Sequence, residues 1–291
     1  MRVVVFGATG TIGTALVPLL AREHEVVAVS RHGRAAAGAV IWARADAGDA
    51  ASVRAALAGA DVAYYLVHSL GSSDFERRDR VAAETVAAEA GAAGLRQIVY
   101  LGGLGDDAPD LSPHLRSRIE TGRALAGGTT PVTTIRAAMV VGAGSAAFET
   151  ILALVDRLPA MVCPRSVSTP TQPIALDDVV AYLAAVCGRA ECFRQSYDVG
   201  GPEVMTYRQM IEQIGKLRGR RPLIVEVPVL TPRLSSYWLR LVTPVGAAVA
   251  RPLIEGLRTA TVMRDERIRQ LVPLELTPFG TAVARAVEAR R

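Results

Sequence analysis

The chain has 291 residues, half of them hydrophobic, and carries a formal net charge of +5. That length is enough for one elaborated α/β domain or for a nucleotide-binding domain with a smaller lobe. Arginine supplies nearly all of the positive charge and is dispersed, without a basic block or interleaved aromatic residues. The sequence therefore predicts no nucleic-acid partner.

The composition also argues against several other classes of protein. No run of about 18 apolar residues occurs, and the first residues lead into a predicted strand rather than an export signal. We therefore expect a cytoplasmic protein, monomeric or homodimeric, with no integral membrane segment. The dispersed cysteines and histidines predict neither a disulfide framework nor a metal site. Lys216 is the only lysine, which excludes a Walker A lysine.

Up to about residue 140, short β-branched runs alternate with longer helical stretches rich in alanine and arginine. This alternation is typical of crossover helices between the strands of a parallel sheet. The pattern predicts strands over residues 2–6, 25–30, 39–43, 61–67, 97–101 and 132–136. It predicts helices over residues 11–22, 50–58, 74–93 and 113–126.

Beyond Gly142 the order is less regular. Helices are predicted over residues 146–157, 176–187 and 207–217, with strands at 196–199 and 222–228. Residues 159–173 are rich in proline and carry no predicted element. The remainder, including residues 230–257 and 277–290, is predicted to be mainly helical.

A glycine-rich turn follows the first predicted strand and opens the first helix. Gly7 permits the tight exit from the strand, Gly10 leaves space for a pyrophosphate, and Gly13 lets the helix pack closely. Free N–H groups at the start of such a helix favour a phosphate. We predict that the intervening Thr9, Thr11 and Ile12 also contact the ligand. A tight turn with no ligand is the alternative.

This turn and the alternating elements predict an α/β fold of the Rossmann type, a doubly wound parallel sheet with a smaller, mainly helical C-terminal substrate lobe. Residues 1–142 are predicted to form the NAD(P)-binding core. Residues 143–291 are predicted to return to the core and to form the substrate lobe.

The ends of the next strands supply the other candidate cofactor contacts. Ser30 and Arg31 follow the second strand, where arginine suits a 2′-phosphate, so the sequence predicts NADP(H) rather than NAD(H). The alternative is that Arg31 and the nearby Arg34 are solvated charged residues of a loop and bind no phosphate. Asp46, after the third strand, is a candidate for the adenine amino group or an N-cap. After the fourth strand, Leu66, Val67 and His68 are predicted to lie beside the ribose of the nicotinamide half.

These motifs resemble those of the atypical short-chain dehydrogenase/reductase superfamily, in particular its NmrA-like, NAD(P)H-binding branch and the YbjT-like bacterial subgroup. The resemblance spans most of the chain. It is carried by the glycine turn and by segments 66–71, 114–118, 136–145, 172–174 and 200–203. It implies the fold and the cofactor, and it implies no agreed substrate.

Standard members of the superfamily use a serine after the fifth strand and a Tyr-x-x-x-Lys pair. Here Gly102 and Gly103 occupy the serine position, and His114 and Arg118 occupy those of the pair. We predict that His114 acts as the catalytic proton donor, because an unperturbed imidazole titrates near neutral pH. A residue that only opens the helix is the alternative. Arg118, also assigned to the catalytic set, could bond the nicotinamide ribose but cannot relay a proton.

The first functional hypothesis is an NADPH-dependent oxidoreductase that transfers hydride to a carbonyl, a quinone or an activated double bond of a small apolar substrate. An aliphatic stripe within residues 151–162 favours the apolar substrate, with ordinary helix core as the alternative. Arg136 could orient an anionic group or pair with Glu120 or Asp177. Two other functions remain open: a non-catalytic NADP(H)-sensing NmrA-like regulator, and a biosynthetic epimerase, dehydratase or cyclase that retains the cofactor.

Overall fold

The computed structural model describes residues 1–32, 40–69, 74–105, 111–227 and 256–290. Its centre is a seven-stranded parallel sheet in the order β11-β6-β5-β4-β1-β2-β3. The strands are β1 (Arg2–Phe6), β2 (Glu25–Ser30), β3 (Val40–Arg44), β4 (Val62–Tyr65), β5 (Gln97–Gly103), β6 (Val132–Ala137) and β11 (Ser196–Val199). The predicted doubly wound sheet is confirmed, and the order reverses between β1 and β4.

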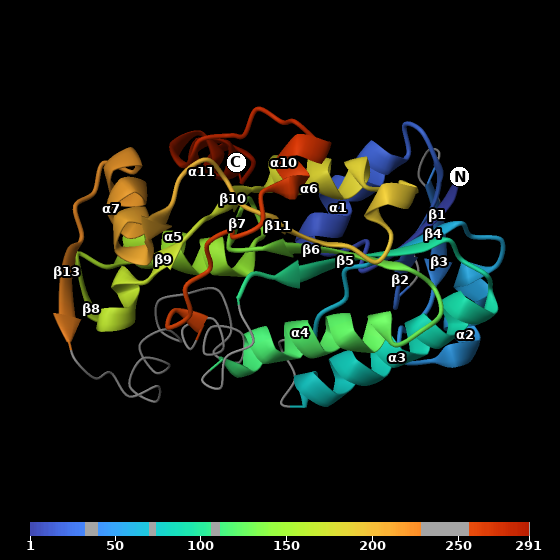
Figure 1. The fold of residues 1–291 in the computed structure, drawn as a ribbon. Helices are drawn as coiled ribbons and strands as arrows, with labels where there is room; N and C mark the ends of the chain where they lie inside the picture. The colour runs from blue at the N-terminus through green and yellow to red at the C-terminus, as the bar shows by residue number, and fades with distance from the viewer. Residues whose placement is uncertain (33–39, 70–73, 106–110, 228–255, 291) are drawn as a thin grey trace.

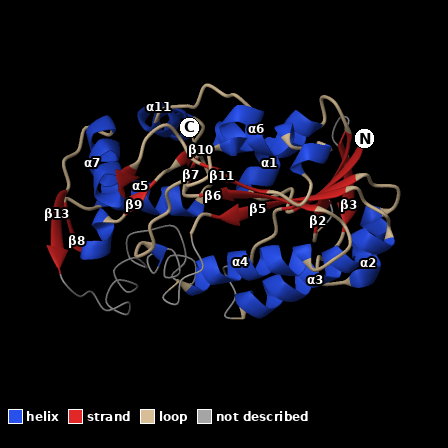
Figure 2. Cartoon of the chain, in the orientation of Figure 1, coloured by secondary structure: helices blue, strands red, loops and turns tan. Residues whose placement is uncertain are grey.

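Helices cover both faces of the sheet (Figures 1 and 2). One face is covered by α1 (Thr11–Leu20), α6 (Leu176–Ala185) and α10 (Arg267–Leu271). The other is covered by α2 (Ala50–Leu57), α3 (Phe75–Ala92) and α4 (Pro113–Ala126). Successive side chains of β1 enter opposite layers, with Val3 and Val5 on one side and Val4 and Phe6 on the other. This two-sided burial explains why the central strands are continuous apolar runs.

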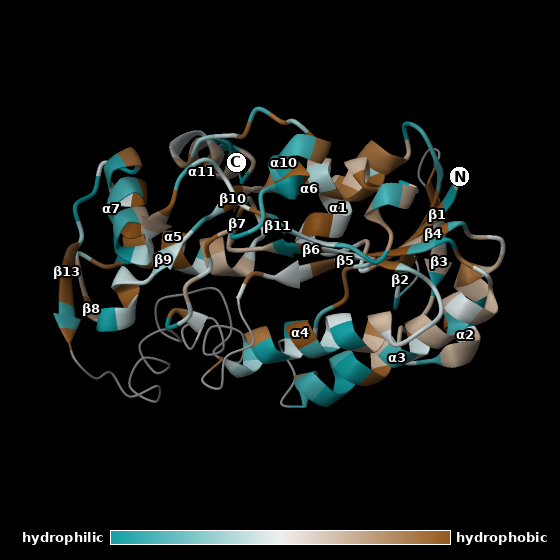
Figure 3. Cartoon of the chain, viewed as in Figure 1, coloured by the Kyte–Doolittle hydropathy of each residue, from teal (hydrophilic) through white to brown (hydrophobic). Residues whose placement is uncertain are grey.

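Apart from α6, β11 and α10, the described elements after β6 build a second, smaller unit at one end of the sheet. Helices α5 (Ala146–Arg157), α7 (Tyr207–Leu217) and α11 (Phe279–Glu288) pack around their own apolar core. Three short two-stranded sheets accompany them: β7 (Val140–Val141) with β10 (Ile174–Ala175), β9 (Pro170–Thr171) with β12 (Met205–Thr206), and β8 (Ala160–Pro164) with β13 (Leu223–Val227). Helices α3 and α4 show hydrophobic and hydrophilic residues in alternation, as helices covering one face of a sheet do (Figure 3).

Several predicted boundaries differ from the structure. The proline-rich residues 159–173, which carried no predicted element, contain β8, the 3-10 turn Arg165–Ser168 and β9. Most of the predicted helix over 230–257 lies outside the described residues. Strand β4 ends at Tyr65 rather than at residue 67, which releases residues 66–69 into a loop at the carboxyl edge. The division of the chain at residue 142 stays a prediction.

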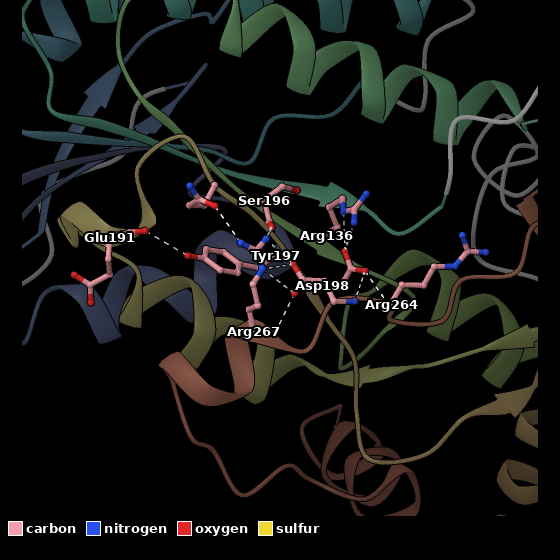
Figure 4. A network of polar contacts seen from close by, with 9 residues as sticks. Arg136, Glu191, Ser196, Tyr197, Asp198, Arg264 and Arg267 are labelled. Atoms are coloured by element: carbon pink, nitrogen blue, oxygen red, sulfur yellow. Dashed lines mark hydrogen bonds and ion pairs between the residues drawn. The ribbon is translucent and has the colours of Figure 1, made fainter.

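A polar network holds β11 at the edge of the sheet (Figure 4). Asp198, which is buried, accepts a hydrogen bond from Arg136 Nε at 2.7 Å and backbone N–H bonds from Arg264 and Asp265 at 3.1 and 3.3 Å. The predicted partners of Arg136, Glu120 or Asp177, were therefore wrong. The Arg136 guanidinium ties β6 to β11 and to the chain that leads into α10, which is a structural task.

Candidate functional site

A cleft of about 760 Å³ crosses the carboxyl edge of the sheet at the point where the strand order reverses. In open α/β sheets this is the place where ligands bind. Most of the predicted cofactor contacts line it: Gly7, Thr9, Gly10, Ser30, Arg31, Asp46, Leu66, Val67 and His68. Helix α3 adds lining that the sequence reading missed, namely Arg77, Arg78, Val81 and Ala82.

The glycine turn is crowded from two sides. Gly7 has φ +84°, and a Cβ there would lie 2.8 Å from the backbone of Leu66. A Cβ on Gly13 would lie 2.3 Å from the Gly7 carbonyl oxygen and 2.6 Å from the Ala8 Cα. Only glycine fits at these two positions, and the start of α1 is thereby held against the turn. Gly13 packs the helix on the turn itself rather than on the sheet.

Gly10 is the N-cap of α1, and no side chain caps this helix. The first N–H groups of α1 thus have no capping acceptor, which fits a phosphate. Thr11, Ile12 and Gly13 are not among the residues that line the cleft. Thr11 Oγ1 donates to the Gly144 carbonyl at 2.7 Å, and Ile12 packs on the core. These three residues could reach a phosphate through their backbone, and that role stays a prediction.

At the other side of the turn, Arg31 is exposed at the end of β2, beside Ser30. Ser30 Oγ is buried and has no hydrogen-bond partner among the described residues, so this wall of the cleft holds a polar group that none of them satisfies. An exposed guanidinium and an unsatisfied hydroxyl fit an added phosphate on a bound nucleotide. Arg34 lies outside the described residues. Arg78, on α3, brings a second exposed guanidinium to the cleft.

Asp46 is not the N-cap of α2. Its Oδ1 accepts the Gly48 N–H at 2.9 Å within the loop, whereas Asp49 accepts the Ser52 N–H at 3.0 Å and caps the helix. The Asp46 side chain stabilises the turn and also lines the cleft. Its predicted contact with an adenine amino group stays a prediction.

Three side chains from separate elements meet next to the cleft, and of these three only His68 lines it. His68 Nδ1 lies 2.6 Å from Asp79 Oδ2, and His68 Nε2 lies 3.1 Å from His114 Nδ1. His68 stands in the loop after β4, Asp79 in α3, and His114 in the first turn of α4. The Asp79 carboxylate is only 1% exposed and also accepts the Ser69 N–H at 2.9 Å. The sequence reading found both histidines and missed Asp79.

Burial governs the protonation of this cluster. It lowers the pKa of His114 to about 3, helped by the charge of Arg118 and by His68. Burial also lowers the pKa of His68 and outweighs the hydrogen bond to Asp79. For Asp79, burial opposes ionisation, but hydrogen bonds from His68 and Ser69 hold its pKa below the usual value. At neutral pH the cluster is a carboxylate with two neutral imidazoles. The premise of an unperturbed His114 pKa is therefore corrected, while its catalytic role stays a prediction.

Arg118 lies one turn after His114 on α4. Its guanidinium lies 4.9 Å from the centre of the Tyr100 ring, and the Tyr100 hydroxyl donates to the Arg118 carbonyl at 2.7 Å. A Cβ on Gly103, at the end of β5, would lie 3.8 Å from the Arg118 side chain. Arg118 thus stands beside the end of β5, and its contact with a ribose stays a prediction.

The aliphatic stripe does not form a substrate wall. Its main members are buried in the core between α5, α7 and α11: Ile151, Leu152, Val155 and Met161. The alternative interpretation of the stripe as helix core accounts for these residues.

Within the described residues no helix combines the length and apolar character needed to cross a bilayer, and no metal-binding group of three or more acidic, histidine or cysteine side chains was found there.

The N-terminal part of the chain is similar to known proteins. Residues 7–126 match the model of a family described as NAD(P)H-binding. A mitochondrial NADH dehydrogenase [ubiquinone] 1 alpha subcomplex subunit 9 from Arabidopsis thaliana is 26% identical over 241 residues, which cover 77% of this chain. The match spans 60% of the length of that plant subunit.

Solved structures share the fold over nearly the whole chain. A nucleoside-diphosphate-sugar epimerase from Staphylococcus aureus superimposes with a TM-score of 0.79 at 17% identity, covering 97% of this chain and 99% of the epimerase. An NADPH-dependent quinone oxidoreductase from Escherichia coli, solved with NADPH, superimposes with a TM-score of 0.77 at 20% identity, covering 98% and 99%. Residues 7–126 therefore match an NAD(P)H-binding family, and the whole chain shares its fold with these epimerase and reductase structures.

Proposed function

We propose that the protein is an NADP(H)-dependent oxidoreductase that reduces a carbonyl, a quinone or an activated double bond of a small molecule. The observation that carries this proposal is the single cleft that joins Arg31, the glycine turn and His68 at the carboxyl edge of the sheet. The bound cofactor would supply or accept a hydride. The protein's own residues would bind it, orient it and manage the proton that accompanies the hydride.

In this proposal each end of the cleft has its own task. The uncapped start of α1 and the space over Gly10 hold the pyrophosphate. Arg31 holds the 2′-phosphate and makes NADP(H) the preferred cofactor, with NAD(H) bound more weakly. Leu66 and Val67 flank the nicotinamide half, and His68 leads to His114 and Arg118 at the place of hydride transfer.

The fold shared with the quinone oxidoreductase supports this choice of reaction. A quinone or enone product can take its proton from water, so the missing serine, tyrosine and lysine do not exclude such a reduction. The aliphatic stripe gives the apolar substrate no support, because its main members are core. An apolar substrate stays a prediction without a structural argument from this lobe.

A panel assay tests the proposal. The purified full chain is mixed with NADPH and with quinones, enones and ketones, and the absorbance of reduced nicotinamide is followed. We expect consumption of NADPH above the protein-free rate with at least one of these acceptor classes. Tight NADPH binding with no consumption across the panel would overturn the reductase.

A second candidate is an NADP(H)-sensing regulator that does no chemistry. It is favoured by the neutral state of His114, whose pKa of about 3 leaves no acidic proton on the imidazole at neutral pH. The panel assay separates the two functions, because a regulator binds the cofactor and leaves it unconsumed. An epimerase would also leave the cofactor without net consumption, because it would interconvert a nucleotide sugar.

A further inference from the structure

Asp79, His68 and His114 form a continuous line of hydrogen bonds, which we call the His-His-Asp chain. Asp79 accepts bonds from the Ser69 N–H at Oδ1 and from Ser117 Oγ at Oδ2, the latter at 3.5 Å. Its carboxylate therefore needs a proton on the facing ring nitrogen, His68 Nδ1. A neutral His68 then has no proton on Nε2, which lies 3.1 Å from His114 Nδ1. His114 Nδ1 must therefore carry the proton of this hydrogen bond.

The same reasoning fixes the outer nitrogen of the chain. A neutral His114 with its proton on Nδ1 has a bare Nε2, and this atom has no partner among the described residues. His114 is partly exposed, whereas Asp79 is buried at the other end. A buried carboxylate thus determines, through two rings, whether the outer nitrogen donates or accepts a hydrogen bond.

We propose that the His-His-Asp chain is a proton relay in which His114 Nε2 exchanges a proton with the ligand and Asp79 is the positioning residue. The inference rests on the proposed oxidoreductase function and deepens it. In the oxidative direction the O–H bond of a substrate hydroxyl breaks and an Nε2–H bond forms on His114. The proton between the rings then moves from His114 Nδ1 to His68 Nε2.

The positive charge therefore comes to rest on His68, hydrogen-bonded to the Asp79 carboxylate, and the atoms and charges balance. A bound nicotinamide would accept the hydride from the carbon that bears this hydroxyl. Reduction runs the steps in reverse, with the proton returned through His114 Nε2 to the carbonyl oxygen. The relay explains how a histidine whose own pKa is lowered so far could still take part, because the charge does not stay on His114.

Of the two rings, His68 is the one whose direct neighbour favours a positive charge. Arg118 on α4 disfavours a positive charge on either imidazole, and Asp79 on α3 favours one. Tyr65 on β4 and Tyr100 on β5 also face the cluster, and burial raises the pKa of both phenols, which keeps them neutral. Asp79 is thus the anion that stabilises a proton stored on the ring pair, and His68 is the ring in contact with it.

The tautomers can be measured without any substrate. Nitrogen-15 NMR of the histidine rings at pH 8 separates a protonated ring nitrogen from a bare one. We expect His68 and His114 both to carry their proton on Nδ1. His24 and His32 are not part of the His-His-Asp chain and serve as internal references. A proton on Nε2 of either His68 or His114 in the wild-type protein would overturn the relay.

Asp79→Asn should reverse the direction of each hydrogen bond in the His-His-Asp chain. The side-chain amide keeps an oxygen for the Ser69 N–H and turns its NH2 group toward His68 Nδ1, so the proton of His68 should move to Nε2. His114 should follow, with its proton on Nε2. Glu76→Gln, on the exposed side of the same helix, removes one negative charge as a matched control and should leave both rings unchanged. Unchanged tautomers in folded Asp79→Asn protein would overturn the relay.

With a ketone acceptor from the panel, whose oxygen must be protonated, Asp79→Asn should lower kcat by about 10²-fold or more and leave the dissociation constant of NADPH unchanged. Glu76→Gln should retain the wild-type kcat. Loss of turnover with every acceptor would sink the proposed reductase while the tautomer measurement still tests the chain. Wild-type kcat in Asp79→Asn would sink the relay while the reductase stands.

Discussion

The two ends of the cleft are built in different ways. The glycine turn comes from one continuous stretch, and its shape is fixed by backbone contacts that only glycine allows at Gly7 and Gly13. The histidine end is assembled from the loop after β4, from α3 and from α4, and its contacts join side chains up to 46 residues apart. The glycine turn is determined by local sequence, whereas the histidine end forms only once the helices have packed.

Replacing His114 should have the largest effect at the assembled end. We expect His114→Ala to lower kcat by about 10²- to 10⁴-fold with the best ketone acceptor, because the group that exchanges the proton is lost. Binding of NADPH should change little. His24→Ala, at a histidine outside the cleft, is the control. Unchanged turnover in His114→Ala would remove His114 from the mechanism and leave this end of the cleft without a catalytic role.

Gly13→Ala tests the crowding at the continuous end. The new Cβ would meet backbone atoms of Gly7 and Ala8 at 2.3 and 2.6 Å, and backbone cannot yield as a flexible side chain does. We expect a loss of about 2 kcal/mol in unfolding free energy, since overpacking at about 3 kcal/mol exceeds the roughly 1 kcal/mol that alanine gains over glycine in a helix.

Gly10→Ala is the matched control, because its Cβ would meet nothing closer than 3.4 Å. This variant should unfold at the wild-type denaturant concentration and bind NADPH more weakly, since the methyl group enters the space of the pyrophosphate. Equal stability of Gly13→Ala and Gly10→Ala in urea titrations would contradict the difference between the two positions.

Arg31→Asp tests which cofactor the cleft prefers. Loss of one charge-assisted hydrogen bond should cost about 1.5 to 3 kcal/mol, so the ratio of NADPH to NADH affinity should fall by roughly ten- to a hundredfold. Arg44→Asp makes the same charge change at the end of β3, outside the cleft lining, and should leave the ratio unchanged. If both variants shift the ratio equally, the effect is general electrostatics rather than a contact by Arg31.

The lowered imidazole pKa values predict an acid-sensitive fold. Unfolding restores the ordinary pKa near 6.5, so below that pH the unfolded chain binds protons that folded His114, with its pKa of about 3, does not. Stability should be full above pH 7 and fall by about 1 kcal/mol per pH unit between pH 6 and 4. His114→Gln should show a shallower fall in urea titrations. Equal slopes in the two proteins would contradict the lowered pKa.

Much of the sheet could be predicted, because strands buried on both faces are continuous apolar runs between helical stretches. Strands β1 and β2 were predicted with their observed bounds. The short strands after β6 could not be, because residues 159–173 contain several prolines and their partners lie far along the chain. Their pairing depends on tertiary contacts rather than on local pattern.

The sequence pattern around Asp79 indicates a buried carboxylate, which our sequence analysis did not predict. It shares the inner stripe of α3 with Ala82, Ala83 and Val86, all of them buried. An acidic residue on an apolar stripe is costly to bury unless it is paired, and so it indicates a hidden partner. The sequence could have revealed the need for a partner. It could not have named His68, which reaches Asp79 only because the loop after β4 lies over α3.

Calorimetric titration of the full chain with NADPH and with NADH tests the central claim most directly. We expect one site for each cofactor, with NADPH bound at least about tenfold more tightly because Arg31 holds its 2′-phosphate. Binding of neither cofactor, or equal affinity for the two, would contradict it.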